Sequence, residues 1–168
     1  MAESINILFI CTENACRSQI AEGWAKALHQ DQLAVRSAGV VANGVNPNAV
    51  EVMREAGIDI SAQRSEVVAA KDYEWADIIV TVCEQADRHC PTLPAGKIKY
   101  HWPIKNPVGL KADSDGVSGR DGDVAMQVFQ RCRDEIKKRI ISLFQMEGIA
   151  HSEVLQAKPT QVLEQVSS

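Results

Sequence analysis

The segment "CTENACRS", residues 11–18, combines a cysteine, an arginine and a serine in a pattern that suits nucleophilic chemistry on an anion. A thiolate at Cys11 is a competent nucleophile. The planar guanidinium of Arg17 can hold two oxygens of a tetrahedral anion at once, which a lysine cannot do. Ser18 could hydrogen-bond the Cys11 sulfur and stabilise it as thiolate. These residue types predict attack by Cys11 on a bound oxyanion.

The surroundings of Cys11 favour this interpretation over a structural one. The Cys-x5-Arg spacing alone occurs by chance in about one chain in five, and the alternative is a buried cysteine that ends a strand, with Arg17 on the surface. However, an apolar, β-branched run at residues 5–10 precedes Cys11, and a helical pattern follows it. A strand end, a tight loop and a helix N-terminus together collect backbone N–H groups, which bind oxyanions.

The elements that position this loop alternate along the chain. Strand-like runs at residues 5–10, 34–37, 77–83 and 97–102 are separated by helical stretches, which predicts an α/β fold with a parallel sheet. After Arg17, the apolar residues Ile20, Trp24 and Leu28 recur every four positions, so a helix would bury them on one face and leave Glu22 and Lys26 elsewhere.

Other segments carry boundary signals. In "NPNAVEVMREAG", Asn46 is a candidate N-cap, Pro47 occupies the first helical position and Gly57 ends the helix. Residues 107–123 are rich in glycine, aspartate and serine and predict an exposed loop, and helical periodicity follows from residue 123. We expect one domain at residues 1–147 and a loosely docked or flexible tail at residues 148–168.

Composition bounds the class of protein. The chain has 168 residues, 45% of them hydrophobic, and a net charge of −4 without a basic stripe, which argues against nucleic acid as a partner. The N-terminus lacks the pattern of a signal peptide, and no apolar run approaches bilayer length, so we expect a cytoplasmic protein with no membrane partner. In that compartment five cysteines are more often catalytic, metal-binding or inert than disulfide-bonded.

"CTENACRSQIAEGWAKAL" resembles the phosphate-binding loop and first helix of arsenate reductases built on the low-molecular-weight protein tyrosine phosphatase fold. Further segments resemble the same family in the same order: "RSAGV", "VMREAGIDIS", "DIIVTVCEQADRHCP" and "HWPIKNP". The similarity spans about residues 5–144, and an ordered set of motifs is more specific than any one of them. It implies a single domain with a four-stranded parallel sheet flanked by helices.

The resemblance also assigns roles to individual residues. Cys11 would attack arsenate, Cys83 would attack Cys11 as arsenite leaves, and Cys90 would pass the disulfide outward to thioredoxin. Arg17 and Ser18 complete the implied catalytic set. The implied oxyanion-binding residues are Thr12, Glu13, Asn14, Ala15, Cys16 and Arg17. Cys16 matches a family position without a required role, and Cys132 is expected to be structural.

The pair Cys83 and Cys90 distinguishes a reductase from a phosphatase, because a phosphatase needs one thiol while reduction needs two electrons. If residues 84–89 form a helix, about 10 Å separates the two Cα atoms, and a disulfide tolerates about 7 Å. The segment is therefore either already a loop or a helix that unwinds on oxidation, and the helix-compatible "EQADRH" predicts the second. The alternatives are a buried structural Cys83, or a zinc site with His89 and His101, although six residues between cysteines exceed the usual two to four.

The resemblance fails at Asn106, where this family usually has the aspartate of an Asp-Pro dipeptide. An amide cannot donate a proton as a carboxylic acid does, a contribution of about 10²- to 10⁴-fold. The departure weakens the phosphatase interpretation more than the reductase one. The carboxylates of the neighbouring loop are possible substitutes without a preferred member: Asp113, Asp115, Asp121 and Asp123.

Some reductases of this family hold a potassium ion near the anion-binding loop. The resemblance implies ligands here at Asn14, Glu22, Ser37 and Glu66, although Glu66 stands where an aspartate is usual. The alternative for Glu22 and Glu66 is surface charge. The implied cofactor is therefore potassium or none.

The sequence favours an arsenate reductase that acts on arsenate, with phosphate and sulfate as competing oxyanions and thioredoxin as reductant. The alternative is a low-molecular-weight protein tyrosine phosphatase acting through Cys11 and Arg17. A third class is a non-catalytic sensor of phosphate or arsenic, which would bind without turnover.

Overall fold

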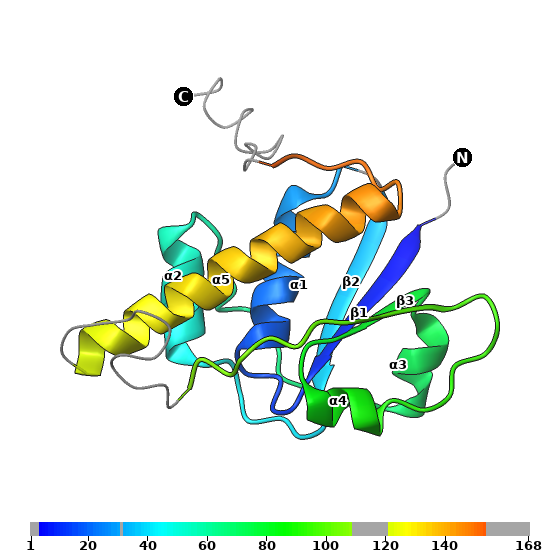
Figure 1. The fold of residues 1–168 in the computed structure, drawn as a ribbon, viewed down its shortest axis with the longest axis horizontal. Coiled ribbons are helices and arrows are strands. Elements are labelled where there is room, and N and C mark those ends of the chain that lie inside the picture. The colour runs from blue at the N-terminus through cyan, green and yellow to red at the C-terminus, as the bar shows by residue number, and fades with distance from the viewer. Residues whose placement is uncertain (1–3, 31, 109–120, 154–168) are drawn as a thin grey trace.

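The computed structural model describes residues 4–30, 32–108 and 121–153. It contains a four-stranded parallel sheet with helices on both faces, which confirms the predicted fold class (Figure 1). The elements in chain order are β1 (Ile5–Cys11), α1 (Arg17–Leu28), β2 (Leu33–Gly39), α2 (Pro47–Glu55), α3 (Ala70–Trp75), β3 (Ile78–Thr81), α4 (Glu84–His89), β4 (Ile98–His101) and α5 (Asp121–Met146).

The strand order is β2-β1-β3-β4. The chain therefore adds β2 on one side of β1 first, and later adds β3 and β4 on the other side. Right-handed crossovers then place α1 and α4 on opposite faces of the sheet. The order reverses between β1 and β3, and the carboxyl ends of parallel strands at such a point form the binding crevice of this architecture. β1 ends there at Cys11, which pairs in register with Gly39 of β2.

α1 is enclosed, since it contacts β1 and β2 on one side and α5 on the other (Figure 1). Ile20, Trp24 and Leu28 are buried as predicted, but Glu22 is also buried, with 7% of its surface exposed. The alternative interpretation of Glu22 as surface charge is therefore wrong. The reason is non-local: the segment at residues 63–66 runs along α1, where the Gln63 amide donates to the side-chain oxygen of Gln19 at 2.8 Å.

Local signals predicted several boundaries well. Asn46 caps α2, because its side chain accepts a hydrogen bond from the Asn48 N–H at 2.8 Å. Pro47 is the first helical residue, and Gly57 follows the helix with a φ of +87°, which L-residues rarely adopt. The four strands lie within one or two residues of the predicted runs. Helix α3 was not predicted from the sequence.

The first part of the predicted tail lies against the end of α1. Ile149 is buried, the Gln30 N–H donates to the Ala150 carbonyl at 2.7 Å, and the Ser152 N–H donates to the Leu28 carbonyl at 2.9 Å. The domain boundary at residue 147 stays a prediction. Residues 154–168 of the tail and 109–120 of the predicted loop, which include Asp113 and Asp115, lie outside the described residues. Within the described ranges, no helix is long and apolar enough to cross a membrane.

Candidate active site

The loop at residues 12–17, which we call the anion loop, is held by hydrogen bonds that a neighbouring segment donates to its carbonyl groups. The carbonyls of Cys11, Thr12, Glu13 and Ala15 each accept a hydrogen bond of 2.8–3.1 Å from a backbone N–H of residues 40–46. The two polar groups of a trans peptide point in opposite directions. The loop N–H groups therefore face the concave side, where an oxyanion would lie.

The close packing of this loop on β2 requires a glycine at residue 39. A Cβ atom on Gly39 would lie 2.6 Å from the Asn14 nitrogen and 2.3 Å from the Val41 carbonyl oxygen, both of which are backbone atoms. Asn14 itself has a φ of +49°, an uncommon conformation for a residue with a side chain. The loop is thus held in one shape by its neighbours.

Cys11 is 2% exposed, and its Sγ lies 2.8 Å from the Ser18 Oγ. The Ser18 oxygen accepts a hydrogen bond from the Asn14 amide, also at 2.8 Å. The Ser18 hydrogen is therefore free to be donated to the Cys11 sulfur. A hydrogen bond to sulfur favours the charged, nucleophilic form of the thiol.

Arg17 is buried, not on the surface, and its Nη1 donates to the Ile104 carbonyl at 3.0 Å. This contact links the anion loop to residues 103–107. Asn106 and Glu13 line the same small hollow as Cys11 and Arg17. The Asn106 Oδ1 accepts a hydrogen bond from the Val108 N–H at 3.1 Å. The structure therefore brings Asn106 to the rim of the anion loop.

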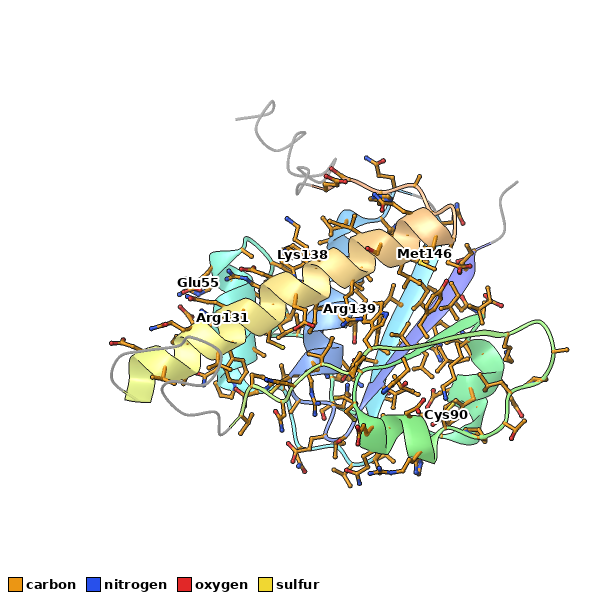
Figure 2. All side chains as sticks on the ribbon, in the orientation of Figure 1. Glu55, Cys90, Arg131, Lys138, Arg139 and Met146 are labelled. Atoms are coloured by element: carbon orange, nitrogen blue, oxygen red, sulfur yellow. The ribbon has the colours of Figure 1, made fainter. Side chains whose placement is uncertain are left out.

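Cys83 lies beside the anion loop although it follows Cys11 by 72 positions in the sequence. Its Sγ is 3.1 Å from the Thr12 Oγ1, and the Ala86 N–H donates to the same sulfur at 3.3 Å. Cys90 is half-buried at the other end of α4 (Figure 2). Burial raises the pKa of the Cys90 thiol, and the Lys99 ammonium opposes that shift. One thiol thus adjoins the nucleophile, and another is closer to solvent.

Asp87 of α4 contacts the sheet through an ion pair and a hydrogen bond. Its carboxylate pairs with the Lys99 ammonium at 2.6 Å and accepts a hydrogen bond from the Thr81 hydroxyl at 3.3 Å. The hydrogen bond from Lys99 lowers the pKa of Asp87. Residues 84–89 are helical, as predicted, so a disulfide between Cys83 and Cys90 requires this helix to open.

We expect the amides of residues 84–89 to lose hydrogen-exchange protection when diamide oxidises Cys83 and Cys90 to a disulfide. The helix cannot persist with its two ends bridged, and the Asp87 contacts would separate with it. Hydrogen exchange with mass spectrometry on reduced and oxidised protein measures this, with α2 as the internal control. Equal protection of residues 84–89 in both forms would contradict it.

The other two cysteines are buried. Burial raises the pKa of Cys16 to about 12, and burial likewise raises the pKa of Cys132 to about 12. Both thiols therefore stay protonated at neutral pH and are poor nucleophiles. All five cysteines are free thiols. No group of three or more histidine, cysteine, aspartate or glutamate side chains in the described ranges is arranged to hold a metal ion, so the zinc alternative gains no support.

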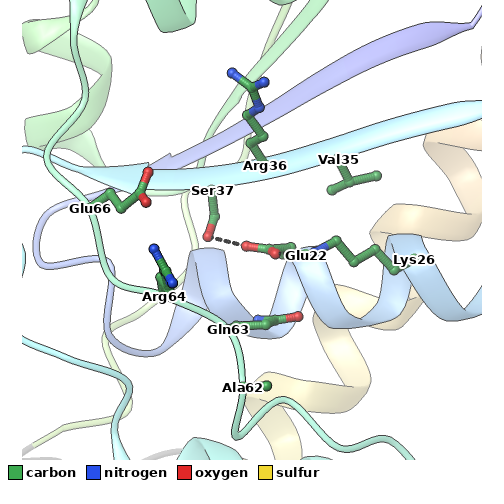
Figure 3. A pocket seen from close by; sticks show the side chains of 9 residues that line it. All are labelled: Glu22, Lys26, Val35, Arg36, Ser37, Ala62, Gln63, Arg64 and Glu66. Atoms are coloured by element: carbon green, nitrogen blue, oxygen red, sulfur yellow. Dashed lines mark hydrogen bonds and ion pairs between the residues drawn. The ribbon is translucent and has the colours of Figure 1, made fainter.

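The four residues expected to bind potassium lie close together but are already bonded to one another. The Ser37 hydroxyl donates to Glu22 at 2.5 Å (Figure 3), and the Asn14 amide nitrogen donates to Ser37 at 3.0 Å. Glu66 takes part through its backbone N–H, which donates to the Asn14 Oδ1 at 2.8 Å, while its side chain is exposed. The other Glu22 oxygen contacts the Lys26 ammonium. The side-chain oxygens of Asn14, Glu22 and Ser37 each already take part in a hydrogen bond or an ion pair, and potassium binding at this site stays a prediction.

Sequence reasoning missed three contacts at this site. It did not predict the Arg17 bond to the Ile104 carbonyl, the contact between Thr12 and Cys83, or the contact between Lys26 and Glu22. The first two join distant segments and leave no local signal. The third was accessible, since glutamate and lysine four residues apart on a helix commonly pair.

Comparison with known proteins agrees with this geometry. Residues 6–158 match the family model described as low molecular weight phosphotyrosine protein phosphatase. An arsenate reductase of Halalkalibacterium halodurans is 46% identical over 134 residues, which is 80% of this chain and 91% of the relative. Arsenate reductase 2 of Staphylococcus epidermidis is 45% identical over 136 residues, 81% of this chain and 93% of the relative.

Solved structures give the same picture. An arsenate reductase in the phosphate binding state is 30% identical and superposes with a TM-score of 0.62 over 84% of this chain and 98% of its own. A YwlE arginine phosphatase is 22% identical, with a TM-score of 0.66 over 84% of this chain and 95% of its own, and supports the fold alone.

Proposed function

The chain belongs to the low molecular weight phosphotyrosine protein phosphatase family, and within it we propose that this protein is an arsenate reductase. The observation that carries the proposal is the position of Cys83, whose sulfur lies 3.1 Å from the hydroxyl of the residue that follows Cys11. A phosphatase needs no second thiol there. Arsenate reduction does, because two thiols that become one disulfide release the two electrons that the reaction consumes.

The first step forms a bond between sulfur and arsenic. Arsenate binds to the N–H groups of the anion loop and to Arg17, and the Cys11 thiolate attacks arsenic. One oxygen of arsenate leaves as water after protonation. Phosphate and sulfate have the same tetrahedral shape and compete for this loop. The donors are already aimed at the anion and need little reorganisation.

The second step transfers the electrons. The Cys83 thiolate attacks the Cys11 sulfur, a disulfide forms between them, and the sulfur–arsenic bond breaks with its electron pair staying on arsenic, which leaves as arsenite. Cys90 then attacks Cys83, so that Cys11 is released and the disulfide moves to the two ends of α4. Opening of α4 would present this disulfide to a dithiol reductant.

We infer that the reductant is thioredoxin and that the reaction takes place in the cytoplasm. An exposed disulfide on an unwound segment suits a protein dithiol, which reduces it by attack on the more accessible sulfur, that of Cys90. The cycle also needs a compartment where thiols stay reduced, which the cytoplasm is.

The test is arsenate-dependent NADPH consumption by the purified protein with thioredoxin and thioredoxin reductase. We expect turnover that stops when arsenate or thioredoxin is left out, with arsenite as the product. Hydrolysis of phosphotyrosine without arsenate reduction would establish the phosphatase instead. Arsenate binding with no turnover by any dithiol or glutathione would establish a sensor.

Replacing Asn106 with aspartate should restore the acid position of a phosphatase. We expect the hydrolysis of phosphotyrosine to rise by about 10²-fold, because a carboxylic acid at this rim would protonate the leaving oxygen. The hydrolysis of p-nitrophenyl phosphate should rise much less, since p-nitrophenolate leaves without a proton. Comparing the two substrates on the two proteins measures this. Equal, small changes for both would show that residue 106 is not the acid position.

A further inference from the structure

We propose that Asp87 is a positioning residue for the two thiols at the ends of α4. Its bonds to the sheet hold α4 as a helix and thereby set how readily Cys83, the N-cap, and Cys90, the C-cap, join as a disulfide. Asp87 acts through the helix and not on a reacting atom. The inference rests on the proposed function only in that these two cysteines form a disulfide.

The contacts of Asp87 converge from the last two strands of the sheet. Its Oδ1 lies 2.6 Å from the Lys99 Nζ, 3.3 Å from the Thr81 Oγ1 and 3.9 Å from the His101 Nδ1. Thr81 is fully buried at the end of β3 and pairs in register with His101 of β4. The carboxylate thus joins the middle of a short helix to the rigid part of the fold.

The rest of α4 makes few contacts with the sheet. Of its six residues, Ala86 is buried, Asp87 is half-buried and the other four are exposed. A second ion pair, Glu84 with Arg88 at 3.8 Å, lies within the helix and is mostly exposed. A helix of six residues is not stable alone in water, because its few hydrogen bonds do not offset the cost of nucleation. The helical form of α4 therefore depends strongly on Asp87.

The two thiols cannot meet while α4 is helical. Cα atoms seven residues apart in a helix are separated by about 10 Å, and a disulfide tolerates about 7 Å. The Cys90 N–H also donates to the Ala86 carbonyl at 3.1 Å, which holds this thiol at the end of the helix. Closing the disulfide therefore opens α4 and separates Asp87 from its partners on the sheet.

Bonds that exist in only one of two states shift the balance toward that state by their own free energy. The Asp87 contacts exist in the dithiol, so they raise the reduction potential of the pair Cys83 and Cys90. This has two consequences for the cycle. The pair is kept from closing before Cys11 has reacted, and the disulfide, once formed, is more easily reduced by a dithiol.

The test is a redox titration of Cys83 and Cys90 at pH 7 in buffers that span a range of reduced to oxidised glutathione. The reference protein carries Cys11→Ala, so that no Cys11–Cys83 disulfide competes. As the disulfide forms, the two thiols give two electrons and two protons to oxidised glutathione, which becomes two molecules of reduced glutathione. Alkylation of the remaining thiols and peptide mass spectrometry measure the oxidised fraction.

Three variants of the reference protein remove the contacts from either side. Asp87→Asn should shift the equilibrium about tenfold toward the disulfide, which makes the potential about 30 mV more negative. Thr81→Val removes only a hydroxyl, and Lys99→Met removes only the ammonium. Each should shift the equilibrium about fivefold in the same direction. The matched control is Arg88→Met, which removes an exposed cation of α4 whose ion pair lies within the helix and should leave the potential close to the reference.

A double substitution separates this effect from a direct effect of charge. The Lys99 ammonium also lowers the pKa of the Cys90 thiol, against the larger effect of burial. If Lys99 acts through Asp87, Lys99→Met adds nothing further in the Asp87→Asn background. An undiminished effect in that background, or equal potentials for Asp87→Asn and Arg88→Met, would overturn the inference and leave the relay intact. If no Cys83–Cys90 disulfide forms in the reference protein, the relay itself fails and this inference fails with it.

Discussion

Replacing Cys83 with alanine should abolish arsenate reduction, in single as well as multiple turnovers. The Cys11–arsenic adduct then has no reactive thiol beside it, because Cys16 in the same pocket stays protonated and Cys90 lies at the far end of α4. Arsenite should stay at background in a rapid-quench assay with excess arsenate. Binding of phosphate, which uses the anion loop alone, should persist and shows that the variant is folded.

Two other cysteine variants make this result specific. Cys90→Ala should release a single equivalent of arsenite and then stop with a Cys11–Cys83 disulfide, which lowers the mass of the protein by that of two hydrogens. Cys132→Ala, which removes a buried thiol of α5, should keep multiple turnover. If Cys83→Ala turns over at the rate of Cys132→Ala, the relay proposed here is wrong.

Replacing Arg17 with lysine should lower kcat/KM for arsenate by about 10²- to 10³-fold. The guanidinium donates to the Ile104 carbonyl through Nη1 and still offers N–H groups to an anion. An ammonium is a point charge, so it cannot bind the carbonyl and the anion at the same time in a fixed plane. Steady-state kinetics measures the loss, and phosphate affinity should fall as well, since the same fork holds either oxyanion.

The matched control is Arg54→Lys, which alters an exposed arginine of α2 paired with Glu51. Its kcat/KM should stay within about twofold of the original, as is usual for surface changes. A loss below tenfold in Arg17→Lys would show that charge alone suffices at this position, and that the planar fork has no part in catalysis.

Local patterns predicted much of this molecule. The sequence pattern changes at Cys11: the apolar residues before it are continuous, and those after it recur at every fourth position. This change predicted the strand, the loop and the helix that follows. Asn46, Pro47 and Gly57 fixed the limits of α2, because capping and left-handed conformations depend on neighbouring residues. The helix between Cys83 and Cys90 was likewise expected from its composition.

What the sequence did not reveal depends on contacts between distant segments. Surface charge was one of two interpretations of Glu22, and its burial depends on β2 and on residues 63–66, which lie along α1. The same segment places the Glu66 N–H on Asn14, which orients the amide at the centre of the site. Since periodicity reports only which face of a helix is apolar, it cannot tell which polar residues a later segment will cover.

The outward-bonded carbonyls of the anion loop have a consequence for substrate choice. A loop whose shape is fixed by residues 40–46 and Gly39 recognises charge and tetrahedral form, and phosphate shares both with arsenate. Selection between them therefore falls to the step after binding. Arsenic accepts an electron pair when Cys83 attacks, whereas phosphorus does not and phosphate leaves unchanged. Abundant phosphate would thus bind reversibly and leave, and only arsenate would continue to the irreversible reduction step. This selectivity is kinetic, because it arises after binding.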